Sequence, residues 1–408
     1  MVSANTSERI YLDHAATTAV DPRVVDVMLP ALAQSWGNPS SIYREGQEAR
    51  RLLDEARDRV AAILGAQAAE IVFTAGGSEA DNWAIRGAAY AMQAQGRHIV
   101  TTAIEHHAVL HTCERLEREG FAVTFVPVDA EGFVTPEQVA DAVRDDTTVV
   151  SVMYANNEVG TIEPIAAIAR AVKARNPRTV VHTDAVQAAG ALSLNVDRLG
   201  VDALSLAAHK FYGPKGSGVL YLRTGTPFLP QLLGGAQEKD RRAGTENVAG
   251  AAGLAAALSL AYEEFEQRTA HSAALRDRLL DELPRRVPYT HVNGPRDGAR
   301  RIANNASFCF EFIEGEALLL ALDLGGIAAS SGSACTSGSL EPSHVLRAMG
   351  VPDEIARSSL RLSVGKENTP EQIARVLDAI PRYVERLRAL SPLGPETPDS
   401  GALAAGNA

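Results

Sequence analysis

A lysine and an aspartate follow two apolar segments and could carry the chemistry of an aldehyde cofactor. Asp184 ends the segment 179–184, and Lys210 follows the segment 203–208. If these are neighbouring parallel strands, both side chains open onto the carboxyl edge of the sheet, where ligands bind. A buried carboxylate needs a partner such as a protonated pyridine nitrogen, and a lysine amine displaced from water can form a Schiff base. The alternatives are an aspartate that caps the next helix and a lysine that extends into solvent.

A glycine turn between a predicted strand and a predicted helix is a candidate phosphate site. Gly76, Gly77 and Ser78 follow the apolar segment 70–73. Backbone N–H groups at the start of a helix bind anions, and glycine lets a phosphate approach closely. Ser78 could equally be a plain N-cap of the helix. The turn by itself is therefore a weak signal.

The chain has three cysteines, too few and too scattered for a disulfide framework or a metal cluster, so each needs its own explanation. Cys335 stands among serines, threonines and glycines in the segment 330–339, without the apolar neighbours of a structural cysteine. We interpret it as a nucleophilic thiol on an exposed loop, with an incidental surface cysteine as the alternative.

The other two cysteines, Cys113 and Cys309, are interpreted as core residues. Cys113 is spaced to share one helix face with three leucine and valine residues, Val109, Leu110 and Leu116. Cys309 lies in an alternating segment that we interpret as a strand. We expect the phenylalanines of that segment to take one face of it: Phe308, Phe310 and Phe312.

The apolar segments alternate with longer amphipathic stretches, a pattern typical of a parallel sheet covered by helices. The predicted strands are 70–73, 98–102, 121–128, 147–155, 179–184, 203–208 and 218–223. An Ala-rich helical region near 248–284 follows, and a shorter α+β segment comes after it. The pattern predicts an α/β protein with a large domain and a smaller one.

Composition bounds the class of partner. The chain has 408 residues, of which 46% are hydrophobic, and a net charge of −11, which argues against nucleic acid or an anionic membrane as the main partner. No stretch approaches the roughly 18 consecutive apolar residues of a membrane-spanning helix, and the first residues lack an apolar signal region. We expect a cytoplasmic protein that acts on a small molecule.

From Tyr11 to about residue 388, the chain resembles the cysteine desulfurases of the NifS/IscS type, a group of the class-V aminotransferase family. The motifs that carry the resemblance occur in order: YLDHAATT (11–18), GNPSS (37–41), FTAGGSE (73–79), EHHAVL (105–110), NNEVGT (156–161), HTDAVQ (182–187), HK (209–210), RRAGTEN (241–247), SSGSACTSGSLEPSHVLR (330–347) and SLRLSVG (359–365). Such an ordered series is highly specific.

The resemblance implies a fold-type I enzyme that depends on pyridoxal 5′-phosphate, with a mainly parallel seven-stranded sheet. It implies a large cofactor-binding domain at 18–265 and a small α+β domain made of 1–17 and 266–390, which carries Cys335. We expect the remaining segment, 391–408, to be a disordered tail because it has little to bury.

The resemblance also assigns roles to individual residues. Lys210 would bind the cofactor aldehyde and shuttle protons, Asp184 would pair with the pyridinium nitrogen, and His106 would stack on the ring. The remaining cofactor contacts would be Gln187 at the phenolic oxygen, Gly77, Ser78 and His209 at the phosphate, Thr245 reaching the phosphate from the other subunit of a homodimer, and Asn157. Asn157 and Arg361 would bind the substrate carboxylate. Ordinary core or loop histidines and a surface ion pair of Arg361 are the alternatives.

The implied reaction converts L-cysteine to L-alanine and leaves the sulfur as a persulfide on Cys335, whose long loop indicates a mobile sulfur carrier. The implied recipient is an iron–sulfur scaffold or another acceptor, with a possible iron–sulfur cluster contact at Cys335 and no bound metal of the enzyme's own. Two positions depart from the pattern: Ala207 replaces a phosphate-binding Ser or Thr, and Gly77 stands where Ala is common. The alternatives are a selenocysteine lyase or another lyase of the same fold, and an inactive iron–sulfur assembly scaffold.

Overall fold

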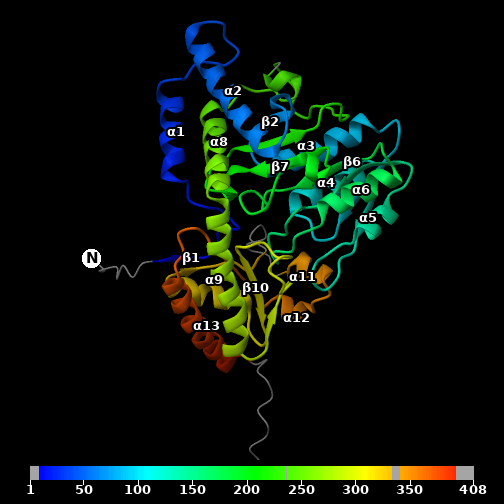
Figure 1. Cartoon of the computed structure of the whole chain (residues 1–408). Coiled ribbons are helices and arrows are strands. Elements are labelled where there is room, and N and C mark those ends of the chain that lie inside the picture. Colours follow the sequence, from blue (N-terminus) through cyan, green and yellow to red (C-terminus); the bar gives the residue numbers. More distant parts are fainter. Residues whose placement is uncertain (1–8, 236, 333–340, 392–408) are drawn as a thin grey trace, which may run out of the picture.

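The computed structural model describes residues 9–235, 237–332 and 341–391. A seven-stranded sheet runs through its larger part, in the order β2-β8-β7-β6-β5-β3-β4 (Figure 1). The strands from β7 to β4 are parallel, and β8 is antiparallel to both of its neighbours. The strands are β2 (Ile71–Thr74), β3 (His98–Thr102), β4 (Ala122–Val126), β5 (Thr147–Ser151), β6 (Val180–Asp184), β7 (Ala203–Ala207) and β8 (Gly218–Leu222). Each predicted strand segment overlaps one of them, which confirms the α/β prediction.

The inner strands are buried along their whole length because helices cover the sheet. These helices are α3 (Gly77–Ala91), α4 (His107–Arg118), α5 (Pro136–Ala142), α6 (Ile165–Arg175) and α7 (Val196–Leu199). Three further helices pack together, α1 (Pro22–Ala33), α2 (Arg44–Leu64) and α8 (Val248–Glu263). Alanine and glycine dominate α8 and bury nearly all of its circumference, as expected for a helix enclosed by other elements. Short 3₁₀ turns occur at η1 (Ala68–Glu70) and η2 (Ala208–Lys210), whereas η3 (Gln237–Asp240) is a turn in which Glu238 and Lys239 have left-handed backbone angles.

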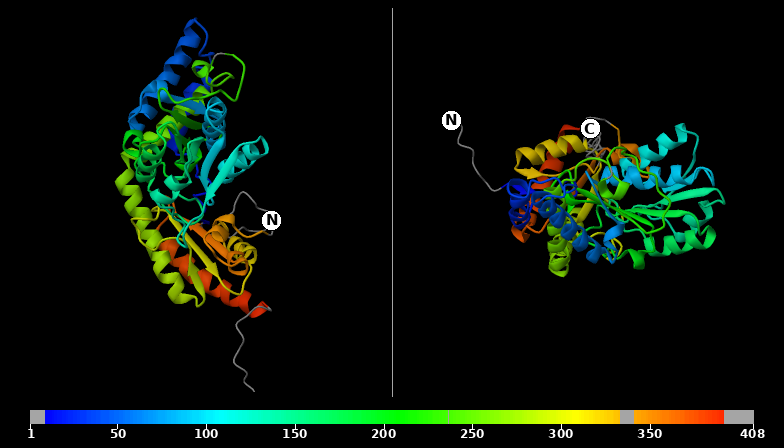
Figure 2. Two further views of the ribbon diagram at one scale, coloured as in Figure 1. Left: turned by 90° about the vertical axis from the view of Figure 1, so that its right-hand side faces the viewer. Right: turned by 90° about the horizontal axis from the view of Figure 1, so that it is seen from above.

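A second, smaller hydrophobic core lies in the lower part of Figure 1 and joins the two ends of the chain. Its strands form a two-stranded and a three-stranded sheet, and the N-terminal strand β1 pairs in parallel with β11. The strands are β1 (Ile10–Tyr11), β9 (Thr290–Val292), β10 (Asn305–Phe310), β11 (Ile327–Ala328) and β12 (Ser359–Ser363). The helices of this core are α9 (Phe265–Arg286), α10 (Gly315–Leu324) and α13 (Pro370–Leu390). The short helices α11 (His344–Ala348) and α12 (Asp353–Ala356) belong to a separate small cluster that includes Cys309. The left view of Figure 2 shows α8 and α9 running along one edge of the molecule from the upper part to the lower part.

Both structural cysteines lie where the sequence predicts them. Cys113 is buried on α4, and Cys309 is buried on β10. The expected phenylalanine row is only partly correct, because Phe308 and Phe310 stack with 6.0 Å between ring centroids but Phe312 lies beyond the end of the strand. Phe312 adopts a left-handed backbone conformation and contacts Tyr289 instead. Within the described ranges, no helix is both long enough and apolar enough to span a membrane.

Candidate active site

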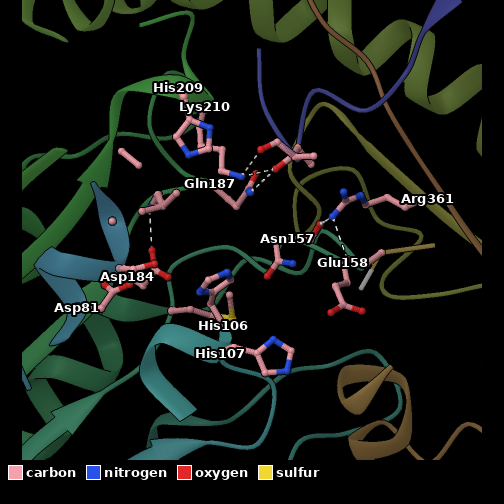
Figure 3. A pocket seen from close by; sticks show the side chains of 18 of the residues that line it. Asp81, His106, His107, Asn157, Glu158, Asp184, Gln187, His209, Lys210 and Arg361 are labelled. Atoms are coloured by element: carbon pink, nitrogen blue, oxygen red, sulfur yellow. Dashed lines mark hydrogen bonds between the residues drawn. The ribbon is translucent and has the colours of Figure 1, made fainter. Parts of the chain in front are cut away.

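A pocket of about 390 Å³ opens at the carboxyl edge of the large sheet, between its strands and the smaller core (Figure 3). It gathers nine of the site residues predicted from sequence: Gly77, Ser78, His106, Asn157, Asp184, Gln187, His209, Lys210 and Arg361. Two predicted residues remain. Thr245 is exposed and is not among the lining residues, and Cys335 lies outside the described residues. The pocket includes Gly332, the last described residue before that segment.

Lys210 reaches the pocket because it sits in the short η2 turn at the end of β7, beside β6, which ends at Asp184. Its Nζ donates hydrogen bonds to the carbonyl oxygens of Ala15, at 2.7 Å, and Ala16, at 2.8 Å. The Gln187 Nε2 donates to the same Ala15 oxygen at 3.0 Å. The N-terminal segment therefore holds the lysine from one side, and the interpretation of Lys210 as a solvent-facing residue is wrong.

Asp184 is a carboxylate in the pocket wall, and it is only 5% exposed. Its Oδ1 accepts a hydrogen bond from the backbone N–H of Val186 at 2.9 Å, in a turn and not at the start of a helix. Burial raises the pKa of Asp184 to about 6, while the Val186 N–H and the Lys210 charge act in the opposite direction. The carboxylate is therefore ionised at neutral pH, and the alternative of a helix cap is wrong.

A second buried carboxylate, Asp81 on α3, lines the same end of the pocket and was missed in the sequence (Figure 3). Burial and the charge of Asp184 raise its pKa well above the usual value, so Asp81 carries a proton when Asp184 is ionised. Its Oδ1 lies 3.6 Å from Nε2 of His182. The signal was available, because Asp81 lies one helical turn after Gly77 and so faces the same way.

His106 is the N-cap of α4, which fixes its ring at the pocket wall. Its Nδ1 accepts a hydrogen bond from the backbone N–H of Ala108 at 3.1 Å, so the neutral ring carries its proton on Nε2. Burial, followed by the positive charge of Lys210 and neighbouring histidines, lowers its pKa to about 4. His106 is therefore a neutral aromatic ring at physiological pH, which suits stacking on a planar ligand.

The glycine turn contributes Gly77 and Ser78 to the pocket wall. Gly76 has φ 155° and ψ −179°, a conformation open almost exclusively to glycine, and it is the N-cap of α3. A side chain on Gly77 would bring its Cβ to 2.8 Å from Cγ2 of Val186, so this close approach requires glycine or a shift of Val186. Ser78 is an exposed residue of the first turn, so its interpretation as the N-cap is wrong.

His209 and Ala207, near the end of β7, also line the pocket. His209 contacts Thr17 Oγ1 through its Nδ1 at 3.2 Å, and burial lowers its pKa to about 4, so the neutral ring keeps one N–H. Ala207 lines the pocket beside it, where the family pattern has a hydroxyl. The methyl group of Ala207 cannot donate a hydrogen bond there.

Arg361 stands on β12 with 2% of its surface exposed, so the interpretation as a surface ion pair is wrong. Its Nη2 donates to Asp13 Oδ1 at 2.8 Å, and its Nη1 donates to the Asn157 carbonyl at 2.7 Å. The side chain of Asn157 lies between His106 and Arg361 in Figure 3. The charge partner Asp13 was not identified from sequence, because it lies at the other end of the chain.

Comparisons with known proteins agree with this geometry. The profile of the class-V aminotransferase family matches residues 10–376. A protein of Methanosarcina thermophila named "Cysteine desulfurase IscS" is 51% identical over 390 residues, covering 96% of this chain and 95% of the relative. A protein of Clostridium botulinum with the same name is 49% identical over 387 residues, covering 95% and 97%.

The chain belongs to the class-V aminotransferase family, in its cysteine desulfurase group. Its fold also matches a solved structure titled "NIFS-LIKE PROTEIN" with a TM-score of 0.87 and 40% identity, covering 93% of this chain and 100% of that one. These matches confirm the resemblance and the fold-type I prediction.

The cofactor of this family is pyridoxal 5′-phosphate, and the residues of the pocket fit it. An acceptor for a protonated ring nitrogen stands at one end in Asp184, and an amine for the aldehyde stands in Lys210. Anion donors stand at the glycine turn, where the first backbone N–H groups of α3 have no partner within the helix. The pocket therefore offers one suitable partner for each of three groups of the cofactor: its protonated ring nitrogen, its aldehyde and its phosphate.

Proposed function

We propose that this protein is a pyridoxal-phosphate-dependent cysteine desulfurase that converts L-cysteine to L-alanine and transfers the sulfur to Cys335 as a persulfide. The observation that carries the proposal is the convergence of Lys210, Asp184 and Arg361 on one pocket, in a chain about half identical to proteins named cysteine desulfurase. When bound, the cofactor supplies an electron sink for the bonds of the substrate Cα.

The protein's own residues bind and orient the substrate. Arg361 and Asn157 receive the carboxylate of L-cysteine, because a guanidinium is a suitable partner for a carboxylate and the Asn157 side chain lies beside it. Binding requires the carboxylate to share Arg361 with Asp13. Asp184, which is ionised at neutral pH, would pair with a protonated ring nitrogen of the cofactor, and the neutral ring of His106 would stack on the cofactor ring.

Proton and sulfur transfer fall to two residues. Lys210, held near the N-terminal carbonyls, removes the proton from the substrate Cα and can return it. The thiolate of Cys335 attacks the substrate sulfur. The bond between that sulfur and the substrate Cβ breaks, its electron pair stays on the carbon part of the substrate, and protonation of that part gives L-alanine. The sulfur stays on Cys335 as a persulfide. The selenocysteine lyase and the inactive scaffold are outcomes of the test below.

The test incubates the cofactor-loaded protein with L-cysteine and measures alanine and, with reductant, sulfide. The native protein is compared with Cys335→Ala and with Cys113→Ala, a control that removes a thiol buried in the core. We expect only Cys335→Ala to lose turnover. Equal rates for native and Cys335→Ala protein would refute the persulfide role. Much faster selenide release from L-selenocysteine would indicate a lyase, and cofactor binding without turnover would indicate a scaffold.

We also propose that the active unit is a homodimer in which Thr245 completes the phosphate site of the partner copy. Thr245 is exposed, and large apolar side chains are exposed elsewhere on the molecule, among them Trp36 at 71% and Leu233 at 83%. Mixing Lys210→Ala with Thr245→Ala chains provides a test, because one site of each mixed dimer would then be native. No recovery of activity in verified mixed dimers would contradict the shared site.

Two smaller proposals follow from the same assignment. The segment 18–265 forms the cofactor-binding domain, and 1–17 with 266–390 forms the second domain. The support is a separate hydrophobic core in the described residues, which joins Ile10 and Leu12 to residues between 275 and 384. The persulfide passes to an iron–sulfur scaffold or another sulfur acceptor, with contact to the nascent cluster at Cys335. Transfer of radiolabelled sulfur from the enzyme to an added scaffold protein would test the second proposal.

A further inference from the structure

Three histidines form a cluster beside the active-site pocket, and the proposed reaction does not use them. His107 and His111 lie one turn apart on α4, so they share a helix face. Their ring centroids are 4.9 Å apart, and the ring of His107 is 4.6 Å from that of His344 on α11. His107 thus stands between the other two, beyond His106 as seen from Lys210 (Figure 3).

The hydrogen bonding of His344 leaves a nitrogen lone pair for a ligand. Its Nε2 lies 2.9 Å from the carbonyl oxygen of Glu105. A carbonyl oxygen can only accept, so Nε2 carries the proton and Nδ1 carries the lone pair. A histidine anchored to a backbone carbonyl through one nitrogen is the usual arrangement of a metal ligand that binds through the other.

The other two rings are suitable ligands. The ring of His107 lies against both other rings, and an imidazole coordinates a metal through a nitrogen that carries no proton. His111 is exposed, so its ring can turn toward His107 without displacing packed side chains. Two histidines one helical turn apart are a recurrent chelating pair in metal sites.

We propose that His107, His111 and His344 bind one divalent transition-metal ion that prefers imidazole, such as Zn²⁺. Three imidazoles leave one position of a tetrahedral ion for water or another ligand. The ion would join α4 of the larger part to α11, the first helix after the segment that contains Cys335. Because His107 and His344 also line the active-site pocket, the ion would lie at the pocket wall.

The test measures Zn²⁺ binding to the cofactor-loaded protein by competition with a chromophoric chelator. His111→Ala removes one ligand that lies outside the active-site pocket. Its matched control is His291→Ala, which removes another accessible histidine, with 47% of its side chain exposed, in the smaller part. We expect His111→Ala to weaken the tightest Zn²⁺ site at least tenfold and to leave zinc-free turnover unchanged, while His291→Ala binds as the native protein does.

Two outcomes would overturn the proposal. The first is equal Zn²⁺ stoichiometry and affinity in native and His111→Ala protein. The second is a strong thiolate charge-transfer band when Co²⁺ replaces Zn²⁺ at the tightest site, because that band would assign the metal to cysteines and not to imidazoles. Neither measurement needs turnover, so the metal site and the desulfurase proposal can fail independently.

Discussion

We predict that replacing aspartate by asparagine has a large effect on activity at one buried carboxylate of the pocket, Asp184, and a small effect at the other, Asp81. Asp184→Asn keeps an oxygen that can accept the Val186 N–H and keeps the side-chain volume, but it removes the negative charge. Asp81→Asn replaces a carboxyl group that already carries a proton with another neutral group. At pH 8, well above the pKa of about 6 of Asp184, only the first substitution changes the charge at the pocket.

The size of the effect follows from burial. Asp184 is 5% exposed, so little water can replace the lost charge. Removing one partner of a buried ion pair costs about 3–5 kcal/mol, which at about 1.4 kcal/mol per tenfold corresponds to a loss of roughly 10²–10⁴-fold in kcat/KM. Asp81→Asn should stay within about tenfold of the native rate because no charge is lost.

The assay is alanine formation from L-cysteine at pH 8, with cofactor loading of each variant verified by its visible absorbance. The reasoning fails if Asp184→Asn retains more than a tenth of the native kcat/KM. It also fails if Asp81→Asn loses as much as Asp184→Asn, because the proton would then not reside on Asp81.

Three further predictions concern other buried groups. Arg361→Lys should raise KM for L-cysteine at least tenfold in steady-state kinetics, because a lysine cannot reproduce the guanidinium fork. Burial raises the pKa of the Cys113 thiol and that of Cys309, the latter to about 11, so iodoacetamide should label Cys335 in the native protein and spare both, as mass spectrometry can show. Burial lowers the pKa of His182 to about 3, so the unfolded chain binds a proton that the folded protein excludes. The free energy of unfolding is therefore highest above pH 6.5 and falls as the pH is lowered toward 3, because the unfolded chain gains a proton there. His182→Asn should lessen the drop in Tm between pH 7 and pH 4.5.

Each of these predictions has a contrary result. An unchanged KM in Arg361→Lys would remove this residue from substrate binding. Labelling of Cys113 or Cys309 as fast as Cys335 would show that burial does not protect them. An equal drop in Tm for native and His182→Asn protein would assign the acid sensitivity to other groups.

The sequence by itself determined the sheet and the position of its catalytic candidates. Short β-branched segments can bury both faces only as inner strands of a covered sheet, so the number of strands and their positions along the chain were visible in the pattern, whereas their order in the sheet was not. The place of Asp184 and Lys210 followed, because a residue at the end of a parallel strand must lie at the carboxyl edge. The identity of the reaction came from the ordered motifs and not from spacing.

Only the tertiary structure decided which distant residues meet these candidates. Ala15 and Ala16 hold Lys210 at sequence separations of 195 and 194 residues, and Asp13 pairs with Arg361 at a separation of 348 residues. Local periodicity carries no information about such pairings, since they depend on how the two cores pack. The sequence also could not show that Asp81 keeps a proton while Asp184 is ionised. Burial and mutual repulsion set the pKa values of the two residues, and both arise only when the chain has folded.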